Sequence, residues 1–352
     1  MATRYEHLGT HPERGPAVLR IWQENLHDLR ECASLEERFR WSYDKNPAGS
    51  ADTVLACGGR HGEPIGCGSI YPRRLSVSGR ELPIGIPADV AVDRPYRTAG
   101  AALGIQRTLI ADRPGQPAFF IGFPNKSALP IFLHVGYRPL ATAGAWVKPL
   151  DATYKLRERM PLPVARAAAA PINLYLRAAD ARRGRDAGRL ATEFVTRADD
   201  RFDTLWQRAR RNHVVTGERT VAYLNWRYTS CPMRKYRFFC VSNDEGLLGY
   251  VAFTTEDGKA FVGDVFALDM KATADTLLLA FAKTLRQQGY QSIFMLYAGN
   301  AAFAARIERL GFIRRPSSGR QLVALHRLGA NREADVLMNA ENWHLFDGEM
   351  DV

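Results

Sequence analysis

The 352-residue sequence has no run of about 18 uninterrupted apolar residues, the length that would predict a membrane-spanning helix. Residues 1–7 carry charge but no apolar stretch follows them, so we expect no signal peptide. Cysteine is scarce: five are scattered along the chain, without a Cys-x-x-Cys pair or a nearby His doublet. This pattern predicts neither a disulfide framework nor a metal site. We expect a protein of the reducing cytoplasm that binds no metal.

Acidic residues are sparse in one segment of a chain whose formal net charge is +11. Residues 154–190 contain nine basic residues against three acids, a local net charge of +6. The basic residues are Lys155, Arg157, Arg159, Arg166, Arg177, Arg182, Arg183, Arg185 and Arg189. Such a segment can attract nucleic acid, an anionic membrane, an acidic carrier protein or a phosphorylated substrate, or it can be a solvated helical connector.

Several landmarks occur twice in the same order, which indicates two copies of one domain. Trp41-x-Tyr43-x-x-x-Pro47 recurs 185 residues later as Trp226-x-Tyr228-x-x-x-Pro232. Three further pairs are separated by 175 residues: 88–90 and 263–265, Asn125 and Asn300, and Gly136-Tyr137 and Gly311-Phe312. We therefore expect a first domain over residues 1–150 and a degenerate second domain over 196–330. They would be joined by a basic helical linker over 151–195 and followed by a tail over 331–352.

The residue patterns of the two copies predict the same order of strands and helices. In the first, strands are expected at 53–58, 65–71, 84–92, 118–122 and near 141–147, with helices at 99–111 and 127–135. In the second, strands are expected at 236–241, 247–254, 260–268 and 292–297, with helices at 272–288 and 301–310. Each copy is thus a mixed α/β domain with an antiparallel front and one parallel crossover. In the linker, Pro161, Pro163 and Pro171 are expected to break the helices, and the tail is expected to pack onto a domain.

One segment that only the first copy contains could hold a phosphate. Arg97-x-x-Gly100-x-Ala102 follows the expected strand 84–92 and opens a helix. The first backbone N–H groups of a helix have no partner inside it, and they bind phosphate together with the helix dipole. Gly100 permits close backbone approach, and Arg97 can add a charged contact. The second copy has Ala-Thr-Ala-Asp-Thr-Leu at 272–277 instead, without Arg or Gly.

In this context the segment resembles the GNAT superfamily of acyl-CoA-dependent N-acyltransferases. The family's strand ending in V-x-V is matched by Val90-Ala91-Val92, and its [Q/R]-x-x-G-x-[G/A] motif by the hexapeptide 97–102. The resemblance implies an α/β fold of two tandem GNAT-like domains. It also implies that Arg97, Thr98, Ala99, Gly100, Ala101 and Ala102 hold the pyrophosphate of an acyl-CoA. Val90, Ala91 and Val92 would line the pantetheine and thioester, an N–H there would stabilise the oxyanion, and Asn125 would lie near the pantetheine arm.

The expected proton donor departs from the family's pattern, and the expected proton acceptor occurs in both copies. Many family members have a Tyr four residues before the Gly-Phe corner, where this chain has Phe132 and Ile307. Tyr137 is the nearby candidate, beside His134 and Tyr96, although such side chains more often only pack. Asp89 is the only acid within the central strand and is the candidate base. Its counterpart Asp264 is a candidate substrate contact. Because an acid occurs in both copies, a structural role stays open for Asp89.

The repeated aromatic residues Trp41, Tyr43, Trp226 and Tyr228 allow two interpretations. They could form a wall around the acceptor, which makes them candidate substrate-binding residues, or they could be a hydrophobic plug at the domain edge.

The resulting hypothesis is an N-acyltransferase that moves an acyl group from acyl-CoA, acetyl-CoA first, to a primary amine of a small molecule, sugar or peptide. Attack is expected to be direct, since no Cys or Ser lies in a nucleophile constellation. The alternatives are an aminoacyl-tRNA-dependent transferase of the tandem type and a binding protein with a vestigial site. An acyl carrier protein is a further expected partner, whereas nucleic acid is not expected because the CoA hexapeptide is intact. The resemblance is to bacterial proteins.

Overall fold

The computed structural model describes residues 3–10, 12–26, 34–58, 61–97, 99–184, 190–316, 320–327 and 332–350. The strands of the first copy are β1 (Arg4–His7), β2 (Asp52–Gly58), β3 (Glu63–Val77), β4 (Arg80–Val92), β5 (Phe119–Gly122), β6 (Arg138–Thr142) and β7 (Gly144–Pro149). Its helices are α1 (Gly15–Asn25), α2 (Leu35–Phe39), α3 (Ala99–Leu109) and α4 (Leu129–His134). The expected order of elements is confirmed, but β3 and β4 extend into a longer hairpin than the sequence indicates.

The second copy repeats this order. Its strands are β8 (Ala191–Val195), β9 (Val215–Gly217), β10 (Arg237–Asn243), β11 (Gly246–Glu256), β12 (Lys259–Ala267), β13 (Ser292–Gly299), β14 (Ile313–Arg315) and β15 (Gln321–His326). Its helices are α7 (Asp200–Ala209), α8 (Val221–Leu224), α9 (Ala272–Gln287) and α10 (Ala301–Arg309). α11 (Arg332–Leu337) and β16 (Trp343–Phe346) follow. In both copies the front strands are antiparallel and one parallel pair, β4 with β5 or β12 with β13, follows a helical crossover. The predicted mixed α/β class is confirmed.

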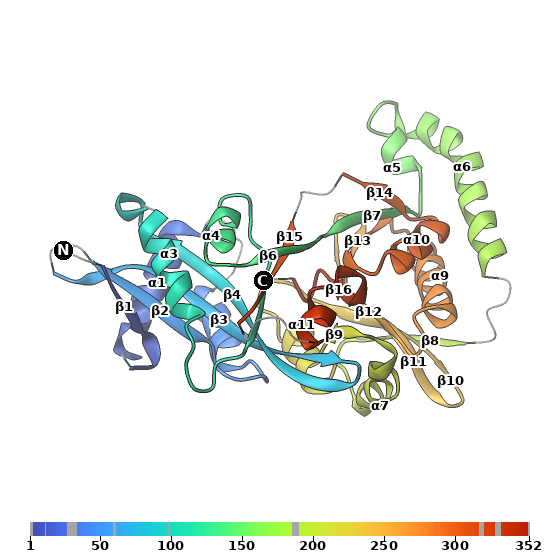
Figure 1. Cartoon of the computed structure of the whole chain (residues 1–352). Coiled ribbons are helices and arrows are strands. Elements are labelled where there is room, and N and C mark those ends of the chain that lie inside the picture. Colours follow the sequence, from blue (N-terminus) through green and yellow to red (C-terminus); the bar gives the residue numbers. More distant parts are fainter. Residues whose placement is uncertain are drawn as a thin grey trace.

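The two copies exchange their last strands. β7 of the first copy pairs with β13 over six positions, from Ser292 opposite Pro149 to Tyr297 opposite Gly144. In return β15 of the second copy pairs with β5. β6 pairs with β15 and β14 with β7, so the strands form one continuous sheet across the molecule (Figure 1). The division of the chain at residues 150, 195 and 330 stays a prediction. Each half of the sheet is completed by a strand of the other copy, β7 in the second half and β15 in the first.

The repeated tryptophans meet at the centre of the interface. The indole Nε1–H of Trp41 donates to the backbone carbonyl of Trp226 at 2.7 Å, and Nε1–H of Trp226 donates to the carbonyl of Trp41 at 2.7 Å. The two rings stack with centroids 4.9 Å apart and an angle of 14° between their planes. Each tryptophan lies in a five-residue π-helical turn, Arg40–Asp44 or Asn225–Thr229. The same local structure is therefore used twice, face to face.

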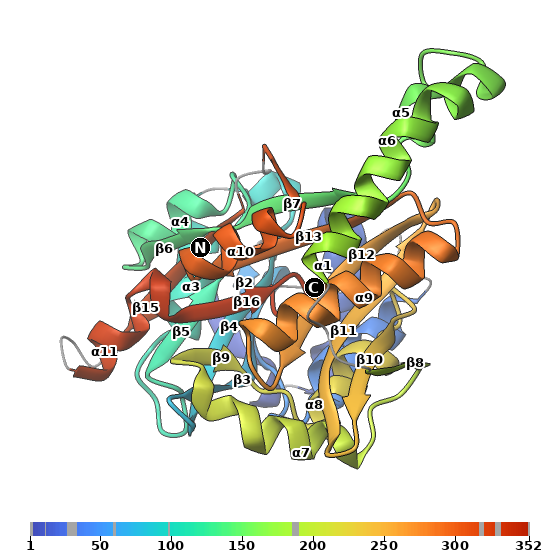
Figure 2. The same cartoon turned by 90° about the vertical axis from the view of Figure 1, so that its right-hand side faces the viewer.

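The linker forms an arm rather than broken helices. α5 (Thr153–Leu156) is followed by α6 (Leu162–Arg183), which runs through Pro171 without interruption and projects from the body (Figures 1 and 2). The expectation that Pro171 breaks this helix was wrong. Pro171 is exposed, so water can satisfy the carbonyl group four residues earlier that loses its N–H partner. Pro161 and Pro163 lie at the start of α6, where a missing N–H costs nothing.

The reciprocal tryptophan bonds predict a measurable coupling across the interface. Trp41→Phe leaves the carbonyl of Trp226 buried without its donor and should lower the free energy of unfolding by about 1–3 kcal/mol. Trp226→Phe should act likewise. In a double-mutant cycle measured by urea unfolding, the two changes should be non-additive by about 0.5–1.5 kcal/mol, since the rings also stack. A cycle between Trp41 and Trp146, which belong to different clusters of the core, should be additive; equal couplings in both cycles would contradict the interpretation.

Candidate active site

The central parallel strands of the first copy part almost at once. Gly85 opposite Phe120 is the one register position at which β4 and β5 pair in the described residues. Beyond it β4 continues to Val92, and its register with β3 shifts where Asp89 and Val90 bulge. Asp89 has a φ of +53°, a backbone conformation that is strained for a residue with a side chain. Residues 86–92 therefore present a strand edge to a gap, and the predicted thioester-lining residues Val90, Ala91 and Val92 lie on this edge.

Two buried polar groups of this copy, one on α3 and one just after α4, have no hydrogen-bond partner among the described residues. Gln106, one turn after Ala102 on α3, is 0% exposed, and neither its Nε2 nor its Oε1 makes a hydrogen bond. The hydroxyl of Tyr137 is also buried without a partner, and burial raises its pKa. Tyr137 packs in the cluster that includes Val90, Ala102 and Phe132. Buried polar groups are normally hydrogen-bonded, so these two require a partner from outside the protein, either water or a ligand.

The predicted phosphate-binding segment lies where a strand gives way to α3. α3 begins at Ala99 and has no acid in its first turn. Arg97 is held in place because its Nε donates to the carbonyl of Val92 at 3.0 Å and its Nη2 to Oδ1 of Asn25 at 2.9 Å. Gly100 is exposed at the helix start. Thr98 lies outside the described residues. The helix start is thus positively charged, as anion binding requires, and the assignment of residues 97–102 to a pyrophosphate stays a prediction.

In the second copy the corresponding gap is filled by the chain itself. β12 pairs with β13 only as far as Val262 opposite Met295, and beyond that β16 pairs with β13 from Tyr297 to Gly299. The segment also bonds to β12, because the N–H of Gly348 donates to the carbonyl of Gly263 at 2.7 Å. Gly299, with a φ of +137°, lies so close to β16 that a Cβ there would be 2.0 Å from the carbonyl oxygen of Trp343. The tail therefore occupies the position that corresponds to the parted edge of β4 in the first copy.

The helix start of the second copy is filled as well. The carboxylate of Asp269 accepts hydrogen bonds from the backbone N–H groups of Lys271 and Ala272, both at 3.0 Å. These are the donors that a phosphate would need at the start of α9. Asp275 adds a second acid to the first turn. The second copy thus fills the space between its parted strands with β16 and satisfies its helix start with its own carboxylate. This gives a physical reason for the asymmetry that the hexapeptide indicates.

Asp89 and Asp264 are both clamped by a buried arginine and a tyrosine. Nη2 of Arg38 lies 2.8 Å from Oδ1 of Asp89, and the hydroxyl of Tyr71 donates to Oδ2. In the second copy the guanidinium of Arg219 contacts both oxygens of Asp264, at 2.9 and 3.0 Å, and Tyr250 donates at 2.8 Å. Both arginines are almost fully buried and paired, and the pKa of each is raised despite its burial, by Asp89 for Arg38 and by Asp264 for Arg219. The buried pair ties α2 to β4 in the first copy and the segment before α8 to β12 in the second, and a catalytic role for Asp89 stays a prediction.

The other predicted site residues are distributed differently. Trp41, Tyr43, Trp226 and Tyr228 are buried in the interface and core, with exposed fractions of 1–5%. Asn125 is exposed, and its Oδ1 accepts from the N–H groups of Ser127 and Ala128 at 3.1 and 2.9 Å. Asn300 caps α10 in the same way. The structure thus brings Val90–Val92 and Tyr137 to the gap, and it places the four aromatic residues in packing. Their assignment to the acceptor, with that of Asp264, stays a prediction.

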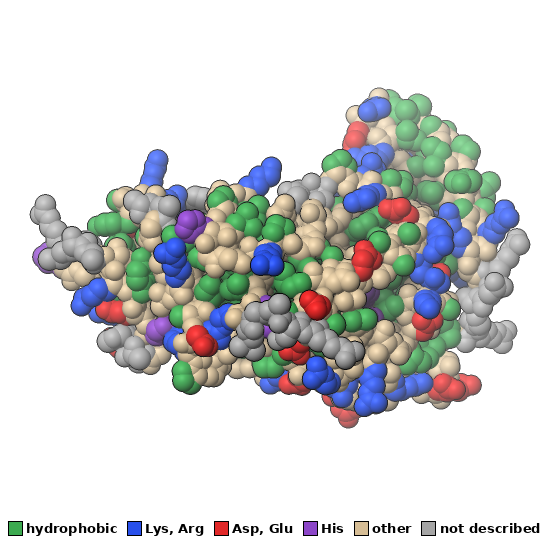
Figure 3. Space-filling view, viewed as in Figure 1, with side chains coloured by type: hydrophobic (Ala, Val, Ile, Leu, Met, Phe, Trp, Pro, Cys, Tyr) green, Lys and Arg blue, Asp and Glu red, His purple; other side chains and the backbone are tan. Residues whose placement is uncertain are grey.

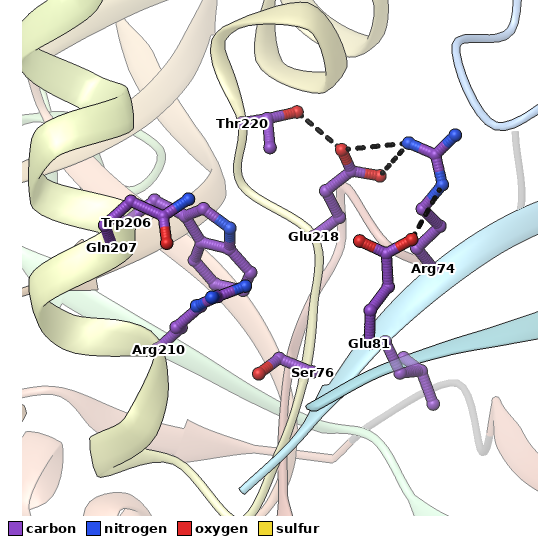
Figure 4. Close-up of a pocket in the computed structure, with 9 residues that line it drawn as sticks. Arg74, Ser76, Glu81, Trp206, Gln207, Arg210, Glu218 and Thr220 are labelled. Carbon is purple, nitrogen blue, oxygen red and sulfur yellow. Dashed lines mark hydrogen bonds and ion pairs between the residues drawn. The ribbon is translucent and has the colours of Figure 1, made fainter. Parts of the chain in front are cut away.

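A cavity of about 70 Å³ lies between the copies, at the end of the β3–β4 hairpin and beside α7 (Figure 4). It is lined by Arg74, Leu75, Ser76, Glu81, Trp206, Gln207, Arg210, Glu218 and Thr220. Glu218 is 6% exposed and accepts a hydrogen bond from Thr220 at 2.6 Å while facing Arg74 at 3.4 Å. Two buried atoms have no hydrogen-bond partner in the described part of the chain, Oγ of Ser76 and Nε of Arg210. The cavity is therefore polar and incompletely satisfied by protein.

A smaller cavity of about 20 Å³ continues toward the gap and shares Arg74, Leu75 and Glu218 with the first. Its inner wall includes Ile86 and Ile121, which follow the point where β4 and β5 part. Glu349 of the tail also lines it. Burial raises the pKa of the Glu349 carboxyl to about 7, although Arg219 opposes this shift from 3.0 Å. A carboxyl group with such a pKa exchanges a proton readily near neutral pH.

Sequence reasoning missed Gln106, Glu349 and Arg38. Gln106 interrupts the apolar face of its helix, and this was the available signal for a polar group directed inward. Glu349 and Arg38 meet their partners only in the folded chain, across 130 residues for Arg219 and 51 for Asp89. In the described ranges no group of three or more His, Cys, Asp and Glu side chains could hold a metal ion.

No protein-family model and no curated protein matches the amino-acid sequence. Solved structures do match the fold. A conserved Enterococcus faecalis V583 protein described as a probable N-acyltransferase has a TM-score of 0.64 at 15% identity, over 93% of this chain and 73% of its own. A GCN5-related N-acetyltransferase from Anabaena variabilis has a TM-score of 0.59 at 15% identity, over 91% and 72%.

The same comparison finds a eukaryotic enzyme. Saccharomyces cerevisiae N-myristoyltransferase, solved with bound myristoyl-CoA, has a TM-score of 0.55 at 11% identity and is matched over 92% of this chain and 82% of its own. At such identities the likeness shows the fold. The fold expected from the GNAT resemblance is confirmed, and the matches extend over both copies together.

Proposed function

Starting from the fold shared with GCN5-related N-acetyltransferases and N-myristoyltransferase, we propose that this protein transfers an acyl group from acyl-CoA to a primary amine. The observation that carries the proposal is the difference between the two gaps. In the second copy β16 and Asp269 fill the gap and the helix start. In the first copy β4 and β5 pair at one position only, and the buried polar atoms of Gln106 and Tyr137 lack partners among the described residues. We therefore propose a single acyl-CoA site, in the first copy.

The residues of the first copy suit the chemical steps of such a transfer. The start of α3 with Arg97 would hold the pyrophosphate, and Gln106 would meet an amide of the pantetheine arm. The edge of β4 at Val90 would direct a backbone N–H to the thioester carbonyl, where negative charge develops as the amine attacks. The C–N bond forms, the C–S bond breaks and CoA leaves as a thiolate that takes a proton. Tyr137 is the candidate donor of that proton, and acetyl-CoA is the first donor to test.

Reversal of the charge at Arg97 should weaken donor binding. In Arg97→Glu a charged contact to phosphate is replaced by repulsion, so the affinity for acetyl-CoA or a longer acyl-CoA should fall at least about tenfold in isothermal titration calorimetry. Lys271→Glu is the matched control at the start of α9, and it should leave the affinity unchanged because Asp269 already fills that site. If the wild-type protein gives no binding heat with any acyl-CoA, the proposed activity is wrong.

Gln106 should affect stability and binding in opposite directions. Gln106→Met removes a buried amide that has no partner, so the free energy of unfolding of the ligand-free protein should rise by about 1–3 kcal/mol. The affinity for acyl-CoA should fall several-fold, because a hydrogen bond to the ligand is lost. Urea unfolding and calorimetry measure the two effects. Gln288→Met, at an exposed glutamine that follows α9, should change neither. A stability loss with unchanged affinity would show that Gln106 has no ligand.

The acceptor is proposed to enter between the copies, through the polar cavity of Figure 4. Its amine would reach past Ile86 and Ile121 to the gap. Ile86 is three residues from Asp89, about 10 Å along an extended strand, so the acceptor has to be elongated. Its far end would meet Arg210, whose Nε lacks a partner among the described residues, beside Glu218. This arrangement favours an amine that carries an anionic group at its other end, such as a short peptide.

Arg210→Glu tests the acceptor path. With a thiol-release assay and a panel of primary amines, the variant should lower kcat/KM at least about tenfold for acceptors with an anionic far end and spare its acyl-CoA affinity. Arg208→Glu is the control, because it lies two residues away on α7, outside the cavity lining. If the two variants lower kcat/KM equally for every amine, the cavity is not the acceptor path. The proposed acyl-CoA site would not be affected by that result.

A further inference from the structure

The arm formed by α5 and α6 exposes an apolar face that nothing in the described protein covers. Five of the eight exposed large hydrophobic residues lie on α6: Leu162, Val164, Ile172, Leu174 and Tyr175. Leu174 and Tyr175 are the most open, at 69% and 70%. Figure 3 shows this apolar surface on the projecting arm, bordered by Lys and Arg side chains. Val164, Leu174 and Tyr175 lie on the side of α6 away from the buried Ala165 and Ala169, and exposed apolar groups gathered on one side of a helix indicate a partner.

The arm is anchored near its C-terminal end and at its middle, where Asn173 bonds to Asp151 and to the N–H of Ala152. Asp180, near the C-terminal end of α6, is buried and accepts from Lys148 and Arg286, both at 2.7 Å. Toward the other end, Ala165 and Ala169 are buried on the side that faces α5. The residues between these contacts at helical spacing, Val164, Ala168, Pro171, Tyr175 and Ala178, all point away from that side and are exposed. The outward face is therefore apolar along its length while the helix itself is held rigidly.

Its charges have one sign. From residue 162 to 179 the only charged side chains are Arg166 and Arg177, and Arg182 and Arg183 follow at the C-terminal end. The acid next in the sequence, Asp180, points into the protein and is neutralised there. Glu158, on the segment before α6, is paired with Lys155 at 2.7 Å. Arginines flanking an apolar face can insert their aliphatic portions beside it and direct their guanidinium groups to phosphates.

We propose that the α5–α6 arm docks on an anionic lipid surface, with Leu174, Tyr175 and Val164 among the acyl chains near the headgroups and the arginines on the lipid phosphates. Apolar and basic groups on one helix are the combination that an interfacial helix needs. Nucleic acid would use the arginines but would leave the aliphatic side chains in water. No helix in the described ranges is long and apolar enough to cross a membrane, so α6 would lie on the surface. The proposal does not depend on acyl transfer.

An acyl carrier protein is the competing acidic partner. It would have to deliver its thioester to the gap beside α3. The arm projects from the second copy, packed on α9, whereas α3 lies at the opposite end of the molecule in Figure 1 and on the other side in Figure 2. A carrier bound to the arm would therefore be far from the donor site. A projecting helix on the side remote from α3 suits a flat, extended surface better.

Co-sedimentation with vesicles tests the proposal on the full-length protein. Vesicles of phosphatidylcholine and phosphatidylglycerol in equal parts should bind the protein, vesicles of phosphatidylcholine alone should bind it at least about tenfold more weakly, and added salt should release it. The double variant Leu174→Glu/Tyr175→Glu should lose at least about tenfold in affinity, as should Arg166→Glu/Arg177→Glu. Since these side chains are exposed, their replacement should leave the circular dichroism spectrum unchanged. Ile313→Glu, at an exposed hydrophobic residue on β14, should bind like the wild type.

Three other results would each contradict lipid binding by the arm. Failure to bind anionic vesicles at low salt, or equal binding to neutral and anionic vesicles, overturns the proposal. A dimer in light scattering that the Leu174→Glu/Tyr175→Glu variant abolishes would assign the face to a second copy of the chain instead. Binding to an acyl carrier protein that the same variant abolishes, without vesicle binding, would assign it to the carrier.

Discussion

A parted pair of parallel strands leaves backbone N–H and C=O groups without partners, and these groups have to be satisfied in a folded protein. Both copies of this domain contain such a pair. In the second copy the chain supplies the partner, because β16 enters the gap and pairs with β13. In the first copy β5 pairs with β15 on one side and meets β4 at a single position on the other. The same requirement is met by protein in one half, whereas in the other half the parted edge is where the donor is proposed to bind.

The exchange of strands makes each copy depend on the other for its structure. β7 completes the second half of the sheet and β15 completes the first, so neither half has its full set of strands alone. The stacked Trp41 and Trp226 hold the halves together through two reciprocal hydrogen bonds. The second copy also provides α7, which forms one wall of the polar cavity. It therefore serves as a structural partner and forms one side of the proposed acceptor path.

Local patterns in the sequence predicted much of this fold. The alternation of apolar residues located β2 to β5 and β10 to β13, and the doubled landmarks located the repeat. The exchange of β7 and β15 could not be predicted, because the apolar pattern of a strand does not specify which neighbouring strand it pairs with. The uninterrupted α6 was missed because the penalty for Pro171 depends on whether water reaches the freed carbonyl. For the site, the spacing of Arg97 and Gly100 placed the helix start, whereas Glu349 reaches its cavity only through the path of the tail.

The comparison of Asp89 with Asp264 separates what the fold needs from what the site needs. Each carboxylate is held by a buried arginine and a tyrosine, and loss of one partner from such a pair costs about 3–5 kcal/mol, which is reason enough to keep it in both copies. The backbone differs: of the two, only Asp89 has a positive φ, and a conformation of this kind costs on the order of 1–3 kcal/mol. The clamp of Arg38 and Tyr71 can hold that strain in place. Where β16 fills the gap the strain is absent. What distinguishes the proposed donor site is therefore the direction of the backbone beside Asp89 rather than the carboxylate that both copies share.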